Sequence, residues 1–177
     1  PGAVNRRLET AGAEAAAEDL GLTVERITAP GTLDGGDVLK VENNATKTAY
    51  VGLGGRTNRE GIDQLAELIT HRGYTVVPVP TQKVLHLKSA VTALPDGTII
   101  GFDPIVDDPN MFASYLSVPE ESGAHVVHLG EDRLLMATGC PQTAALLESR
   151  GYSITLVNIS EFERLEGCVT CLSVRVR

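Results

Sequence analysis

A repeated order of helix, glycine and strand constrains the fold of this chain more than any other feature of its sequence. Each copy has a run of helix-forming residues, a glycine, and a short run of β-like residues. The glycine can take the left-handed conformation that ends a helix, so each junction is a capping signal. The helix, glycine and strand of the three copies fall at 6–20, Gly21 and 22–28; at 58–72, Gly73 and 74–77; and at 141–150, Gly151 and 152–155.

Pairs of strand candidates precede the second and the third of these helices. The first pair lies at 38–42 and 49–53, and the second pair lies at 125–129 and 133–137. Each pair is close enough in sequence to form a hairpin. The repeated unit is therefore a β-hairpin, a helix and a strand.

A degenerate middle copy of the unit fits between the complete units that contain the second and the third helix. Residues 84–94 and 98–102 read as strands on either side of Pro95-Asp96-Gly97, a turn signal, and a short, poor helix candidate follows at 111–115. Repeats of this size predict a radial or layered architecture, because each unit needs its neighbours to bury its apolar face. An open doubly wound sheet is the alternative, but the hairpins and the lack of a glycine-rich phosphate loop count against it.

The composition indicates one globular α/β domain over residues 1–177. With 42% hydrophobic residues the chain can bury a sizeable core. Its 15 Lys and Arg against 23 Asp and Glu give a net field that repels polyanions, so we expect no nucleic-acid partner. No apolar run is long enough to cross a bilayer, and the first residues lack the pattern of a signal peptide. We therefore expect a cytoplasmic protein that does not associate with membranes.

Asp34 and Asp37 flank a glycine pair in Leu33-Asp34-Gly35-Gly36-Asp37. Asp-Gly is common turn chemistry, so the plain interpretation is a turn before a strand. The glycines also allow a ligand to approach the backbone closely, so a functional site is the second interpretation.

His86 lies in Leu85-His86-Leu87-Lys88, where apolar and polar residues alternate. The alternation predicts a strand with His86 and Lys88 on one face. A lone histidine there is usually a partly exposed strand residue. Because histidine changes its charge near neutral pH, His86 is also the best acid/base candidate among the four histidines.

Cys168 and Cys171 form a CxxC motif that precedes a last predicted strand, residues 172–177. A zinc site is unfavourable because there is no second pair and Cys140 is isolated. A redox dithiol usually opens a helix, whereas this pair precedes a strand. The third interpretation makes Cys171 a nucleophile, with a histidine and a carboxylate brought near it by folding.

Four blocks taken together resemble the dimethylarginine dimethylaminohydrolases, and their order and approximate spacing also match. This family belongs to the guanidine-modifying superfamily, and the resemblance implies a partial five-bladed α/β propeller of ββαβ modules. It covers the whole chain but only the last two thirds of a family member. The blocks are LDGGDVL at 33–39, GLGGRTNREG at 52–61, VLHLKSAV at 84–91 and LEGCVTCLSV at 165–174.

The resemblance implies the roles of the catalytic residues. Cys171 would attack the guanidinium carbon of a methylated arginine, and His86 would protonate the leaving amine and then activate water. Asp34 would orient His86. Arg56 would pair with the α-carboxylate of the substrate, where a forked guanidinium fits well. The family chemistry needs no metal or organic cofactor.

The resemblance further implies contacts around the substrate. The carbonyls of two residues would hold its ammonium group, and one hydroxyl would belong to the hydrogen-bonded surroundings. Many relatives lack a cysteine at position 168, so its thiol is expected to be incidental. The three residues are Leu165, Cys168 and Ser89.

Two other functions stay open at this point. Arginine deiminase performs the same chemistry with ammonia as the leaving group, and an inactive binding fragment could keep the fold without the reaction. In relatives, further acidic contacts to the guanidinium come from a segment upstream of the part that this chain matches. We therefore expect that this chain lacks an N-terminal segment or companion chain, and that alone it neither binds methylarginine tightly nor turns it over. The uncovered module faces also predict a marginal or self-associating chain.

Overall fold

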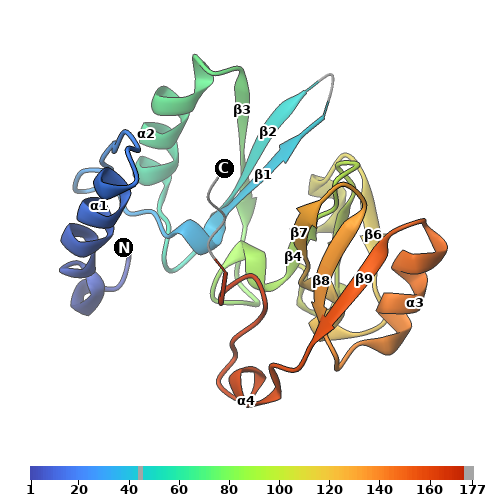
Figure 1. Cartoon of the computed structure of the whole chain (residues 1–177). Helices are drawn as coiled ribbons and strands as arrows, with labels where there is room; N and C mark the ends of the chain where they lie inside the picture. Colours follow the sequence, from blue (N-terminus) through green and yellow to red (C-terminus); the bar gives the residue numbers. More distant parts are fainter. Residues whose placement is uncertain (44–45, 174–177) are drawn as a thin grey trace.

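Three small sheets of identical topology form the body of the described part of the chain (Figure 1). The computed structural model describes residues 1–43 and 46–173. In each sheet an antiparallel hairpin is followed by a strand that pairs in parallel with the second strand of the hairpin. The strand orders are β1-β2-β3, β4-β5-β6 and β7-β8-β9. The predicted β-hairpin, helix and strand unit is thereby confirmed.

The first module contains the hairpin β1 (Val38–Glu42) and β2 (Lys47–Leu53), which pairs Val38 with Val51. Helix α2 (Arg59–Thr70) then crosses to β3 (Tyr74–Pro80). Asn58 caps α2, because its side chain accepts the amide of Gly61 at 2.9 Å.

The second module has the strands but not the α-helix. Its strands β4 (Val91–Ala93), β5 (Ile99–Gly101) and β6 (Tyr115–Ser117) are short. The helix expected at 111–115 is wrong: this stretch contains the end of the 3-10 turn Pro109–Met111 and the start of β6. Pro109 begins the 3-10 turn, and the aromatic residue Tyr115 favours the strand that follows.

The third module repeats the complete unit. Its hairpin consists of β7 (Val127–Gly130) and β8 (Arg133–Ala137), and helix α3 (Pro141–Ser149) leads to β9 (Ser153–Val157). The short helix α4 (Ser160–Glu163) follows.

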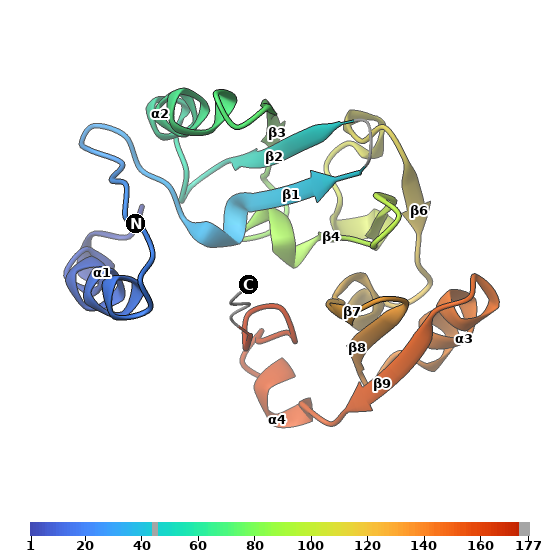
Figure 2. The same ribbon diagram turned by 45° about the horizontal axis from the view of Figure 1, so that its top comes forward.

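The three sheets form an arc, and helices α1 (Glu9–Asp19) and α4 lie at its two ends (Figure 2). Apolar clusters hold successive sheets together: one joins the first and second modules around Val41, Tyr50 and Ile99, and another joins the second and third around Ile100 and Leu134. The chain is thus an open part of an α/β propeller, as expected.

Glycines end all three expected helices in left-handed backbone, as the capping pattern predicts. Their φ angles are 72° at Gly21, 84° at Gly73 and 94° at Gly151. The strand expected at 22–28 is absent, however, because none of the strands that the structure describes lies beside this segment to pair with it. Helix α1 likewise contributes no buried residue.

The strand expected around His86 is also wrong. Residues Leu87–Ser89 form a 3-10 turn that His86 precedes in extended conformation. Leu85 is 53% exposed and Leu87 is 3% exposed, so the two leucines do not share a buried face. The backbone amide of Leu87 donates to the buried carboxylate of Asp37 instead of pairing with a strand.

The last predicted strand, 172–177, falls mostly outside the described residues. The part that is described, up to Ser173, is a turn rather than a strand, and Cys171 lies in that turn. Among the described residues no helix is long and apolar enough to cross a membrane.

Candidate active site

Asp34 and His86, 52 residues apart in the chain, form a contact at the junction of the first two modules. The Nε2 of His86 lies 3.0 Å from the Oδ2 of Asp34, and the carboxylate side chain is 7% exposed. The second carboxylate oxygen of Asp34 accepts the amide of Gly2 at 3.0 Å. Burial by itself would raise the pKa of Asp34, but the hydrogen bonds from His86 and Gly2 outweigh it and lower that pKa.

The glycine pair between the two aspartates makes this contact sterically feasible. A Cβ atom on Gly36 would lie 2.6 Å from Cγ of His86, too close for any other residue without a shift of the ring. The 3-10 turn Gly35–Asp37 therefore lets the backbone pass against the imidazole. This agrees with the close-approach interpretation of the sequence motif.

Asp37 ties three segments of the site together through a buried network. Its Oδ1 accepts the amide of Leu87 at 2.9 Å, and its Oδ2 accepts the hydroxyl of Thr57 at 2.6 Å. The same hydroxyl oxygen accepts the amide of Asp34 at 3.0 Å. Asp37 is 2% exposed and Thr57 is fully buried, and burial raises the pKa of Asp37 despite these hydrogen bonds.

Cys168 and Cys171 form a second pair, with their sulfur atoms 3.1 Å apart. Cys168 is buried and Cys171 is exposed. Although Cys171 as a whole residue is exposed, the partial burial of its sulfur atom and the hydrogen bond with Cys168 raise the pKa of its thiol.

Lys88 links the thiol pair to the segment that carries His86. It lies two residues after His86, and burial lowers the pKa of its ammonium group. The charges of Cys171, Asp37 and Cys168 oppose that shift, which indicates that these groups lie near the ammonium. The thiol pair therefore lies in the neighbourhood of the segment that carries His86.

Arg56 is half-buried, and its backbone lies against Gly2, where a Cβ atom would be 2.4 Å from the Arg56 carbonyl oxygen. The carbonyl oxygen of Ser89 accepts a hydrogen bond from Nε2 of His125 at 3.0 Å. This contact anchors the turn that follows His86 to the third module.

The two residues whose carbonyls are expected to bind the substrate ammonium, Leu165 and Cys168, have different surroundings in this structure. Leu165 is 83% exposed to solvent. The carbonyl of Cys168 already accepts the amides of Cys171 at 3.0 Å and Leu172 at 3.1 Å. Since a carbonyl oxygen has two lone pairs, the turn would have to open before Cys168 could hold an ammonium group.

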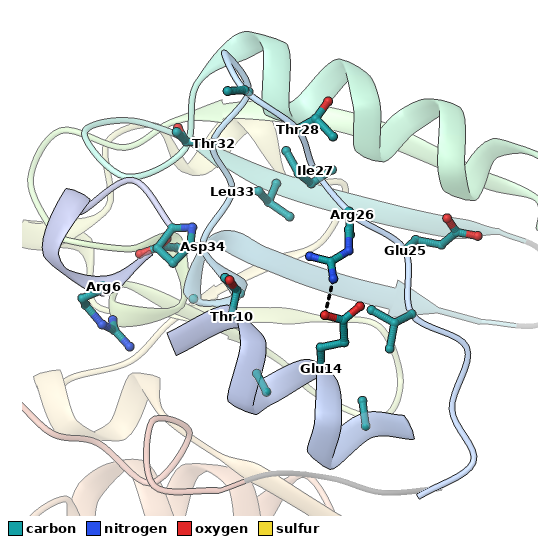
Figure 3. A pocket seen from close by; sticks show the side chains of 18 of the residues that line it. Arg6, Thr10, Glu14, Glu25, Arg26, Ile27, Thr28, Thr32, Leu33 and Asp34 are labelled. Atoms are coloured by element: carbon teal, nitrogen blue, oxygen red, sulfur yellow. Dashed lines mark hydrogen bonds and ion pairs between the residues drawn. The ribbon is translucent and has the colours of Figure 1, made fainter. Parts of the chain in front are cut away.

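A hollow of about 750 Å³ separates α1 from the Asp34–His86 pair. Figure 3 shows Leu33 and Asp34 on one wall and Arg6, Thr10 and Glu14 of the α1 region on the other. Arg26 forms an ion pair with Glu14 across its mouth. Among the described residues that line the hollow, none comes from the turn that holds Cys168 and Cys171. The hollow therefore adjoins the Asp34–His86 pair but not the thiol pair.

Sequence reasoning overlooked the supporting roles of Asp37, Thr57 and Lys88. All three lie inside the quoted motifs, next to residues that were given a role, and this adjacency was the available signal. Within the described part of the chain, no group of three or more His, Cys, Asp or Glu side chains is arranged to hold a metal ion.

Two kinds of sequence comparison identify relatives of this chain. The family described as arginine deiminase matches residues 18–138. An N(G),N(G)-dimethylarginine dimethylaminohydrolase of Streptomyces coelicolor is 60% identical over the whole chain, which covers 67% of that protein. The enzyme of the same name from Pseudomonas aeruginosa is 33% identical over 99% of the chain and 68% of its own length. The chain therefore spans about two thirds of the length of these relatives.

Solved structures agree with this result. A variant of the Pseudomonas aeruginosa enzyme in complex with citrulline superposes with a TM-score of 0.86 at 32% identity, over 99% of this chain and 69% of that one. The N-terminal domain of ArgZ, an arginine dihydrolase of cyanobacteria, has a TM-score of 0.84 at 19% identity over 99% of this chain and 68% of that one, and shares the fold.

Proposed function

The chain belongs to the dimethylarginine dimethylaminohydrolase family, and we propose that it hydrolyses asymmetrically dimethylated arginine, and monomethylarginine, to citrulline and the methylated amine. The observation that carries the proposal is the 3.0 Å contact between Asp34 and His86, formed between residues distant in sequence. Lys88, two residues after His86, lies close enough to the thiol pair to interact with it electrostatically. Such a carboxylate–histidine pair with a nearby cysteine is the set of groups that thiol-based hydrolysis requires.

The first half of the reaction breaks the bond between carbon and the leaving nitrogen. The Cys171 thiolate attacks the guanidinium carbon, a C–S bond forms, and His86 gives a proton to the departing amine. In the second half His86 takes a proton from water, which attacks the same carbon, and the C–S bond breaks to release citrulline. Before the first step the Cys171 sulfur must exchange its contact with Cys168 for the substrate carbon.

Asp34, Arg56 and the carbonyl groups have binding and orienting roles in this proposal. Asp34 holds the imidazole through Nε2, and Arg56 pairs with the α-carboxylate of the substrate. The Ser89 hydroxyl belongs to the hydrogen-bonded surroundings of the substrate. After the turn that holds the two thiols opens, the carbonyls of Leu165 and Cys168 accept the substrate ammonium.

The proposal includes a companion polypeptide segment that fills the hollow beside α1. Helix α1 buries none of its residues, and Leu8 and Leu20 beside it are 90% and 59% exposed. A substrate guanidinium also needs more anionic partners than Asp34, since an unpaired buried charge is costly. A cytoplasmic location belongs to the same proposal, because the reaction needs a free thiol and the cytoplasm keeps thiols reduced.

Citrulline formation tests the function. The chain is incubated with asymmetric dimethylarginine or with arginine, alone and together with a polypeptide that corresponds to the remaining third of the Streptomyces coelicolor relative. We expect little citrulline from the chain alone and substantial citrulline from dimethylarginine in the mixture, with none from Cys171→Ser. A preference for arginine would identify a deiminase, the second candidate that the arginine deiminase family match favours. No product in any preparation would leave a non-catalytic binding fragment.

A further inference from the structure

A closed backbone turn holds the two thiols of the CxxC motif together. The carbonyl of Cys168 accepts the amides of Cys171 and Leu172, which are the third and fourth residues after it. This pattern is that of one helical turn, and it places the side chains of residues three apart on the same side. The sequence argument against a redox dithiol, that the pair should precede a strand, therefore does not hold.

The sulfur atoms are close to bonding distance. They lie 3.1 Å apart, and a disulfide bond needs about 2.05 Å, so about 1 Å of approach would join them. Both cysteines are free thiols. Because the turn already fixes the backbone, closing the bond requires mainly side-chain rotation.

The two thiols differ in access. Cys171 is exposed and meets solutes, whereas Cys168 is 7% exposed and is shielded by the turn. The third cysteine, Cys140, is fully buried, donates to the carbonyl of Ala137 at 3.1 Å, and has a pKa raised to about 11 by burial. Cys140 is therefore an unreactive internal reference.

We propose that Cys168 and Cys171 form a reversible oxidative modification site, in which a hydroperoxide oxidises Cys171 and Cys168 then closes a disulfide. In the first step the Cys171 thiolate attacks the O–O bond, forms a sulfenic acid and releases an alcohol, or water when the oxidant is hydrogen peroxide. In the second step the sulfur of Cys168 displaces the sulfenic oxygen as water, and an S–S bond forms. The two thiols lose two electrons and the peroxide gains them; a dithiol reductant restores both thiols.

The disulfide would protect the nucleophile as well as block it. A lone sulfenic acid proceeds under excess peroxide to sulfinic acid, which ordinary thiols do not reduce. Cys168 prevents this further oxidation of Cys171, because it converts the sulfenic acid to the disulfide first. The effect on citrulline formation depends on the proposed function, whereas the thiol chemistry does not.

Mass spectrometry of the full chain tests the site directly. The reduced chain is treated with hydrogen peroxide at alkaline pH, where more thiolate is present, then unfolded, alkylated and digested with trypsin. Residues 165–175 form one tryptic peptide that contains both cysteines. We expect this peptide to be two hydrogens lighter and unalkylated, Cys140 to be alkylated, and a dithiol to reverse the change. In Cys168→Ser the peptide should instead gain oxygen irreversibly on Cys171.

A second measurement separates the fold from sequence proximity. The same oxidation is repeated in urea, where the CxxC spacing remains but the turn does not. We expect disulfide formation to be about tenfold or more slower, since preorganisation is lost. Equal rates in urea, or oxygen addition to Cys171 in the unmodified sequence, would overturn the proposal. A missing citrulline signal would instead count against the proposed function and leave this result intact.

Discussion

Replacing Thr57 by valine removes one hydroxyl from the centre of the site and leaves the shape of the side chain nearly unchanged. Thr57 is fully buried, and its hydroxyl both accepts the amide of Asp34 and donates to Asp37. An unpaired buried amide costs about 1–3 kcal/mol, and a hydrogen bond to a charged group contributes about 1.5–3 kcal/mol. Since such contributions add incompletely, we expect Thr57→Val to lower the free energy of unfolding by about 3 kcal/mol.

Thermal unfolding followed by circular dichroism measures this loss. For a chain of this size 1 kcal/mol corresponds to about 2–4 °C, so the midpoint should fall by about 6–12 °C. Thr57→Ser keeps the hydroxyl and should lose about 1 kcal/mol, the contribution of one buried methyl group. A loss below 1 kcal/mol in the valine variant would refute the reasoning that the network is fully formed.

Thr143→Val is the matched control outside the site. Thr143 is also fully buried, and its hydroxyl donates to Glu120 at 2.9 Å, in the third module. This variant should also be destabilised, but it should leave the His86 ring signals in the proton NMR spectrum in place. Thr57→Val should move them, because it frees the backbone of Asp34.

Four further outcomes follow from the site. The pKa of Asp34 in the folded chain lies below its usual value of 3.8, so the ionised carboxylate stabilises the fold above about pH 3.8. This stabilisation is lost as the pH falls through the folded pKa. The difference in unfolding midpoint between the unmodified chain and Asp34→Asn should therefore shrink below about pH 3.8. In the complemented preparation, His86→Gln should stay folded and form citrulline about a hundredfold more slowly or worse, and near-normal turnover would remove His86 from the mechanism. Arg56→Lys keeps the charge but loses the fork, so KM should rise more than kcat falls; the reverse would make Arg56 a structural residue. A haloacetamidine label should be found by mass spectrometry on Cys171, and an adduct on another thiol would contradict the assignment of the nucleophile.

The sequence predicted the repeated elements well because their signals are local. The strands at 38–42 and 133–137 match β1 and β8 residue for residue, and the glycine caps end the helices where expected. Alternation of apolar residues and the conformational freedom of glycine act within a few positions of the chain.

The errors fall where a distant partner decides the local structure. Residues 22–28 have a strand pattern, but none of the described strands pairs with them. The segment around His86 has a strand pattern, but the carboxylate of Asp37, 50 residues earlier, accepts the Leu87 amide and forms a 3-10 turn instead. A single sequence does not reveal which distant group occupies the backbone hydrogen bonds.

The site was predicted in the same uneven way. The contact between Asp34 and His86 followed from the resemblance of whole motifs, and the structure contains it. The distance between Cys168 and Cys171 could not follow, because the motif was expected to enter a strand and lies in a turn instead. The roles of Cys171, Arg56 and Leu165 stay predictions.

The hydrogen bond between the Leu87 amide and Asp37 also makes the docking of the modules measurable. Among residues 1–43 and 46–173 every strand pair forms within one module, from residues close in the chain, and such local structure can form early in folding. The bond to Asp37, in contrast, joins two modules and is buried. Hydrogen exchange at the Leu87 amide should therefore report the docking of the first module on the second, separately from the folding of either. If this amide exchanges as fast as those of the exposed turns while the strands stay protected, the two modules separate at a lower free energy than either unfolds.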